Sequence, residues 1–222
     1  MQEQQRLGDK NQPHIVQIMT TEHYNLQSAR SLVTSEQAGR SSLFLSTVTT
    51  ALVALALVAQ ISALGTAFFV FALVLFPSLF FLGLVTFQRT FQIALADFIY
   101  TRGINRIRHL YVELAPQVQD YFILSTHDDE ASIMQDWEAQ AIWWQAFVST
   151  PGMIAVIDSI LGGIFMGLLV YQLFSLSLLL CCTVGFVVFL GILAALYRYL
   201  LTTWRRFQRN VKPLFPTPVQ VE

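Results

Sequence analysis

The chain has 222 residues, of which 55% are hydrophobic and only 12% are charged, and its formal net charge is −1. Because charged residues make up about a quarter of ordinary soluble domains, this composition excludes an ordinary soluble domain and favours a membrane protein. We therefore expect a lipid bilayer as the main partner of the chain and no nucleic-acid partner.

The residues ahead of position 41 are mostly polar. Residues 1–20 are rich in Gln near their start and show no hydrophobic period, so we predict a disordered polar segment there. Residues 21–40 are predicted to form a cytoplasmic helix, in which Glu36 and Arg40 have the i, i+4 spacing that favours an ion pair. No cleavable signal peptide is recognisable, and Met19 is an alternative start.

The segment 41–88 carries no charged residue and is too long for a single membrane crossing, which takes about 20 apolar residues. A less apolar break at residues 60–66 divides it. The segment is therefore predicted to form a transmembrane hairpin with spans at about 42–63 and 67–88. Pro77 lies in the middle of the second span, where we expect it to kink the helix, and it is a candidate hinge.

The segment 151–203 is predicted to form a second transmembrane hairpin. Its apolar part contains a single acidic residue, Asp158, and a less apolar break at residues 172–177. The same length argument places its two spans at about 152–173 and 178–200.

The remaining parts lie between and after the hairpins. Residues 89–150 are predicted to be a cytoplasmic helical region, because their apolar residues recur at steps of three and four. The second span is expected to continue into this region as one long helix that ends near Pro116, followed by an amphipathic helix at about 131–148. The chain ends in a basic, Pro-containing cytoplasmic tail, residues 204–222, which we expect to be extended after its helix.

The thirteen basic residues all lie outside the two hairpin tips. Because basic residues concentrate in cytoplasmic loops, the N-terminus, the central region and the C-terminus are all predicted to be cytoplasmic. The predicted fold class is all-α: an integral membrane four-helix bundle of two transmembrane hairpins, with cytoplasmic helical extensions.

Asp158 is the first candidate functional residue, because an ionisable side chain within a membrane span is costly. Arg198 lies at a similar predicted depth in the neighbouring span, so the two side chains form a candidate intramembrane polar site and a candidate ion pair. Two interpretations remain open: Asp158 holds the hairpin together, or it takes part in an ion or proton path.

Ser159, Gly163 and Gly167 form a ridge of small residues along the third span. Such a ridge allows another helix to approach closely, so these residues are candidates for helix packing within or between subunits. A polar passage along this ridge is the alternative interpretation.

The run 126–130, Thr-His-Asp-Asp-Glu, contains metal-ligating residue types. Adjacent side chains cannot all converge on one ion, whereas Thr126 followed by acidic residues is typical of a helix start, which is the interpretation we prefer. Cys181 and Cys182 are adjacent within a span, where thiols act as small apolar fillers. We find no nucleophile motif, P-loop or dinucleotide fingerprint, and we therefore expect no enzyme, no cofactor and no metal site.

The stretch 22–60, EHYNLQSARSLVTSEQAGRSSLFLSTVTTALVALALVAQ, resembles the start of small bacterial multi-pass membrane proteins of uncharacterised function. This resemblance implies a location in the bacterial inner (plasma) membrane. The order of helix, transmembrane hairpin and cytoplasmic helical extension is also similar to that of two-span pore-forming effectors of bacterial conflict systems, from which this chain departs by its second hairpin.

Two functions fit the sequence. One is a homo-oligomeric ion channel or pore, suggested by the small-residue ridge and by Asp158. The other is a noncatalytic membrane scaffold or signalling component that acts through its cytoplasmic helices on a protein partner that the sequence does not identify.

Overall fold

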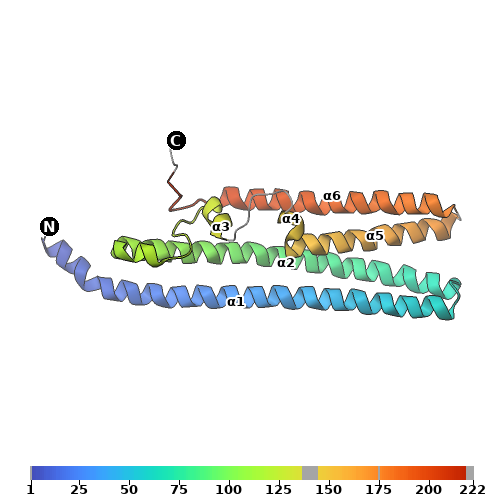
Figure 1. The fold of residues 1–222 in the computed structure, drawn as a ribbon, viewed down its shortest axis with the longest axis horizontal. Helices are drawn as coiled ribbons and strands as arrows, with labels where there is room; N and C mark the ends of the chain where they lie inside the picture. Colours follow the sequence, from blue (N-terminus) through green and yellow to red (C-terminus); the bar gives the residue numbers. More distant parts are fainter. Residues whose placement is uncertain (1, 137–144, 175, 219–222) are drawn as a thin grey trace. The chain divides into compact units, whose positions relative to one another are not determined.

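The computed structural model describes residues 2–136, 145–174 and 176–218, and this part of the chain is helical with no strand. Two helices form its first half: α1 (Gln2–Ile61) and α2 (Thr66–Leu114). Shorter elements follow, namely the 3-10 helix η1 (Pro116–Tyr121) and helices α3 (Glu130–Asp136) and α4 (Gln145–Val148). Helices α5 (Thr150–Phe174) and α6 (Leu178–Asn210) complete the chain, as Figure 1 shows.

Four of these helices are long and apolar enough to cross a membrane, judged by their length and composition: α1 from residue 12 on, α2, α5 and α6. Helix α1 ends and α2 begins within the predicted break at residues 60–66. Helix α5 ends within the break at 172–177, and α6 begins directly after it. The all-α fold with four long apolar helices is therefore confirmed, together with the two predicted turns.

The turn between α1 and α2 is closed by main-chain contacts. The amide of Leu64 donates to the carbonyl of Ala59 over 3.2 Å, which is the six-residue hydrogen bond of a Schellman helix end. Ala63 (φ 46°) and Leu64 (φ 59°) both adopt left-handed conformations. Helix ends usually place Gly at this position because a Cβ is unfavourable there, so this turn is strained.

Contacts divide the chain into two compact units. Unit 1 comprises Met1–Ser35, Ala94–Ile142 and Phe207–Glu222. Unit 2 comprises Glu36–Ile93 and Trp143–Arg206.

Unit 2 is a four-helix bundle with an apolar core. Helices α1, α2 and α5 supply its buried side chains, and α6 adds partly buried Leu196 and Leu200. The buried set is Phe44, Val48, Ala72, Phe76, Leu79, Phe87, Ile154, Ala155 and Leu161. At its polar end, Glu36 accepts from Arg40 Nε at 2.7 Å and from Arg89 at 2.9 Å, which confirms the predicted Glu36–Arg40 pair.

Unit 1 is built on the antiparallel neighbours α1 and α2. Arg30 Nε donates to Asp97 Oδ1 over 2.7 Å, and the Thr20 and Tyr111 hydroxyls lie 3.3 Å apart. Leu26 packs against Gly103, where an added Cβ would approach the Leu26 side chain to 2.9 Å. In the described part of this unit, the buried apolar side chains are Phe98, Ile104, Ile107 and Ile133.

Of three expectations for the polar parts, one is confirmed and two need revision or qualification. The predicted disordered segment 1–20 is helical from Gln2 on, because extending an existing helix avoids the cost of nucleation and Gln, Glu, Lys and Arg are good helix formers. Helix α2 runs unbroken to Leu114, as predicted, and Ala115 (φ −148°) leaves the helical region ahead of Pro116. The helix predicted at 131–148 is present as α3 and α4, and residues 137–144 lie outside the described part.

Candidate functional site

The last turns of α2 present a polar face within unit 1. Arg102, Asn105 and Arg106 stand at steps of three and four, so they share one side of the helix. Arg102 and Asn105 are buried, with exposed fractions of 4% and 0%. Buried polar groups of this kind need partners, and the loop before α3 and the C-terminal tail provide them.

Asp128 is the centre of this site. Its side chain is fully buried, and it accepts hydrogen bonds from Arg106 Nε at 2.7 Å and from the backbone amides of Leu214 and Phe215 at 3.1 and 2.8 Å. Arg102 approaches the same carboxylate at 3.5 Å. Burial raises the pKa of the Asp128 carboxyl, but the two amides and Arg106 outweigh burial and lower the pKa below its ordinary value.

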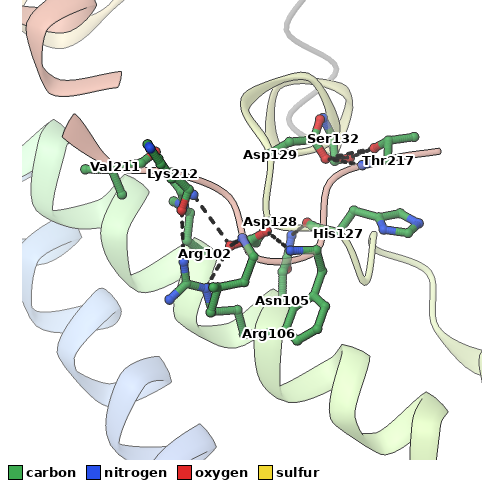
Figure 2. A network of polar contacts seen from close by, with 12 residues as sticks. Arg102, Asn105, Arg106, His127, Asp128, Asp129, Ser132, Val211, Lys212 and Thr217 are labelled. Carbon is green, nitrogen blue, oxygen red and sulfur yellow. Dashed lines mark hydrogen bonds and ion pairs between the residues drawn. The ribbon is translucent and has the colours of Figure 1, made fainter. Parts of the chain in front are cut away.

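The two arginines also bind the tail directly. Arg102 donates to the carbonyl of Val211 over 2.9 Å, and Arg106 donates to the carbonyl of Lys212 over 3.5 Å. The amide of Asp128 donates to the carbonyl of Phe215 over 3.2 Å. Figure 2 shows these groups converging on the extended tail from α2 and from the loop before α3.

Asp129 holds the end of the bound segment. Its Oδ1 accepts from the amide of Thr217 at 3.0 Å and from the Thr217 hydroxyl at 2.8 Å. Asp129 also accepts from the amide and hydroxyl of Ser132, so it caps α3. Burial raises the pKa of the Asp129 carboxyl, but its bonds to Thr217 and Ser132 outweigh burial and lower the pKa.

An aromatic contact completes the site. The ring of Phe215 stacks on the imidazole of His109 with centroids 3.9 Å apart and planes inclined by 21°. His127 lies next to His109, with ring centroids 6.0 Å apart. We call the whole arrangement the tail clamp; it consists of Arg102, Asn105, Arg106, His109, Asp128, Asp129 and Ser132, and it holds residues 211–217.

The tail clamp is arranged for binding and not for metal coordination. The carboxylate oxygens of Asp128 and Asp129 already accept hydrogen bonds from arginines, amides and hydroxyls of the chain. Within the described residues, no group of three His, Cys, Asp or Glu side chains is placed to hold a metal ion. The arrangement fixes an extended segment against a helix.

The expectation for the run 126–130 was right about a helix start but wrong about its capping residue. Helix α3 begins at Glu130, and Asp129, not Thr126, provides the cap. The role of Asp128 was missed altogether. A signal existed in Arg102 and Arg106, which share one helix face, but their partners lie 22 to 109 positions away along the chain.

Asp158 lies in the core of unit 2, fully buried, and neither carboxylate oxygen has a hydrogen-bond partner. It faces α2 at Gly83, where an added Cβ would lie 2.0 Å from Asp158 Oδ1. The expected ion pair with Arg198 is therefore not formed. The reason is geometric: the Asp158 carboxylate points at the backbone of α2, while Arg198 is exposed on α6.

The two glycines of the small-residue ridge of α5 pack against α6 within the same hairpin. A Cβ on Gly163 would lie 2.7 Å from the carbonyl oxygen of Gly185, and one on Gly167 would lie 3.2 Å from that of Cys181. Ser159 is fully buried and donates to the carbonyl of Ala155 over 2.6 Å. Gly163 and Gly167 thus bring the backbones of α5 and α6 together, whereas the Ser159 hydroxyl bonds within α5.

Pro77, the candidate hinge, lies inside α2, which continues through it. Proline has no amide hydrogen and cannot donate to the carbonyl of residue 73. The helix therefore lacks one hydrogen bond at this point without being interrupted.

Unit 2 also contains an open apolar groove of about 720 Å³ beside α5 and α6. Phe68 and Phe186 line it together with the glycines of the α5–α6 crossing, and Cys181 and Cys182, both free thiols, lie in its wall. A wall of this composition offers apolar contact and no cluster of charged groups.

Comparisons of the chain with protein-family models, with curated proteins and with solved structures find no match. The resemblance to bacterial membrane proteins therefore stays a prediction.

Proposed function

We propose that the chain is a multi-pass protein of the bacterial inner (plasma) membrane, with unit 2 in the bilayer and both termini in the cytoplasm. The four long apolar helices support this proposal, because each exceeds the roughly 20 residues that cross a bilayer. The distribution of basic residues supports the orientation. Reporter fusions after residue 65 and at the C-terminus test it, since the first should report the periplasm and the second the cytoplasm.

Within that arrangement, we propose that the protein is a noncatalytic scaffold or signalling component that binds a protein partner through unit 1. The observation that carries this proposal is a pair of almost fully exposed apolar side chains in this unit. Tyr121 is 83% exposed and Ile123 is 98% exposed. Leu124 next to them is also exposed, and neighbouring exposed apolar side chains in a water-facing region favour a protein contact.

Site-specific crosslinking in living cells tests this role. A photoreactive amino acid in place of Ile123 should give a crosslinked product of discrete mass, and the same group in place of Glu22 should not, because Glu22 is an exposed polar position on α1 of the same unit. Mass spectrometry of the product should identify one partner. Ile123→Lys should abolish the association of that partner with the otherwise native chain.

Asp158 favours a second candidate, the homo-oligomeric ion channel or pore. A buried carboxylate with neither oxygen paired is the kind of intramembrane group that ion paths contain. Light scattering of the purified protein and ion flux in liposomes test this candidate. A defined oligomer whose flux is lost in Asp158→Asn supports it, whereas a monomer without flux rejects it.

A further inference from the structure

The tail clamp recognises mainly the main chain of the segment it holds. Carbonyls of Val211 and Lys212 accept from two arginines, and the amides of Leu214 and Phe215 donate to Asp128. The amide of Thr217 donates to Asp129. Because every peptide has these carbonyls and amides, this part of the recognition is independent of sequence.

Two positions of the bound segment are selected by their side chains. Phe215 stacks on His109, and the Thr217 hydroxyl is bonded to Asp129 and to the hydroxyl of Ser132. Between and around them the site makes little use of side chains, since Leu214 is 63% exposed. The chemical pattern that fits is therefore an aromatic residue followed two positions later by Ser or Thr.

The site is supported by bonds that do not involve the tail. The Asn105 amide donates to the carbonyl of His127 over 2.9 Å, which ties the loop to α2. The amide of Ser125 donates to both oxygens of Asp136, and the Ser132 amide donates to Asp129. The loop before α3 thus keeps its anchors when the tail leaves, and a vacant site would expose charged groups that need a new partner.

We infer that the tail clamp is a peptide-binding site for an extended segment with the pattern aromatic-x-Ser/Thr, and that the C-terminal tail of this chain is its intramolecular occupant. A tethered ligand acts at a millimolar effective concentration, so the tail keeps the site closed to weaker competitors. This inference rests on the proposed partner-binding role of unit 1 and names the site that a partner peptide would occupy.

The test uses the full-length chain in nanodiscs and a labelled peptide of residues 210–218, NVKPLFPTP. The double variant Phe215→Ala/Thr217→Ala weakens the chain's own tail and leaves every residue of the site unchanged. The native peptide should bind this variant saturably and bind the wild-type chain on the order of a hundredfold more weakly, because the tethered tail competes. A peptide with Phe215→Ala should bind the variant about tenfold more weakly than the native peptide.

Circular dichroism and thermal melting establish that the double variant is folded. A folded variant that fails to bind the peptide overturns the inference, and so does equal binding to variant and wild type. A photoreactive phenylalanine analogue at position 215 of the peptide adds a second readout, since it should crosslink to the region around His109. Peptide binding tests the inference about the tail clamp, and crosslinking at Ile123 tests the proposed partner-binding function. The two results are independent, so a failure of one can be told from a failure of the other.

Discussion

Among the side chains whose burial the structure describes, each unit buries one aspartate completely: Asp128 in unit 1 and Asp158 in unit 2. Asp128 is surrounded by donors from two arginines and two backbone amides, whereas both oxygens of Asp158 lack a partner. A buried carboxylate with donors ties distant segments of the chain together, and one without donors is a cost that the apolar packing around it has to offset. Asp128 therefore stabilises the fold of unit 1, whereas burial of the unpaired Asp158 side chain lowers the stability of unit 2.

The largest effect is expected from removing the paired aspartate. Asp128→Ala leaves Arg102 buried without its carboxylate partner, and breaking such a pair costs about 3–5 kcal/mol. Thermal unfolding of unit 1 measures the loss. Asp120→Ala removes the same charge from an exposed position of the same unit and should leave the melting temperature unchanged; equal losses in the two variants would contradict the role given to Asp128.

Acid should weaken the same site less than the substitution does. The pKa values of Asp128 and Asp129 lie below their ordinary values in the folded protein, so these carboxylates stabilise the docked tail at neutral pH and lose that contribution as the pH falls below about 4. Fluorine NMR of a fluorinated Phe215 follows the release, because its ring leaves His109. A resonance that stays constant down to pH 2 would contradict this account.

A different prediction concerns the close packing around the unpaired Asp158 side chain. Gly83→Ala puts a methyl group 2.0 Å from Asp158 Oδ1, and overpacking of this kind costs about 1–3 kcal/mol. Gly191→Ala is the matched control, since nothing lies within 4 Å of its added Cβ. Thermal melting should show the loss at Gly83 alone, and Asp158→Ala in the same chain should restore most of it.

The smallest effect concerns the turn of the first hairpin. Ala63 has a left-handed conformation with φ 46°, so Ala63→Gly should stabilise unit 2 by about 0.5–1 kcal/mol. Ala195→Gly, within α6, should destabilise it by about 0.5–1 kcal/mol, because Gly is unfavourable inside a helix. A lower melting temperature for Ala63→Gly would show that the turn is not strained.

The sequence was sufficient for features that depend on local pattern. The uncharged segments predicted the long helices, their less apolar breaks predicted both turns, and the i, i+4 spacing predicted the Glu36–Arg40 pair. Pro116 marked the end of α2 because it restricts the residue before it.

Features that depend on distant parts of the chain were not predictable in this way. The partners of Asp128 lie 22 to 87 positions away, and Gly83, which makes room for Asp158, belongs to the other hairpin. Arg198 was expected to pair with Asp158 because the two residues lie at a similar predicted depth in neighbouring spans. Depth in the membrane does not determine the direction in which a side chain points around its helix.

Hydrogen exchange of the amides of Leu214, Phe215 and Thr217 in the full-length protein in nanodiscs tests most directly whether unit 1 holds the tail through its aspartates. These amides donate to Asp128 and Asp129 and should be protected, and Asp128→Asn should remove the protection of Leu214 and Phe215 first. Exchange of all three amides at the rate of the free peptide in the wild-type chain would contradict the account.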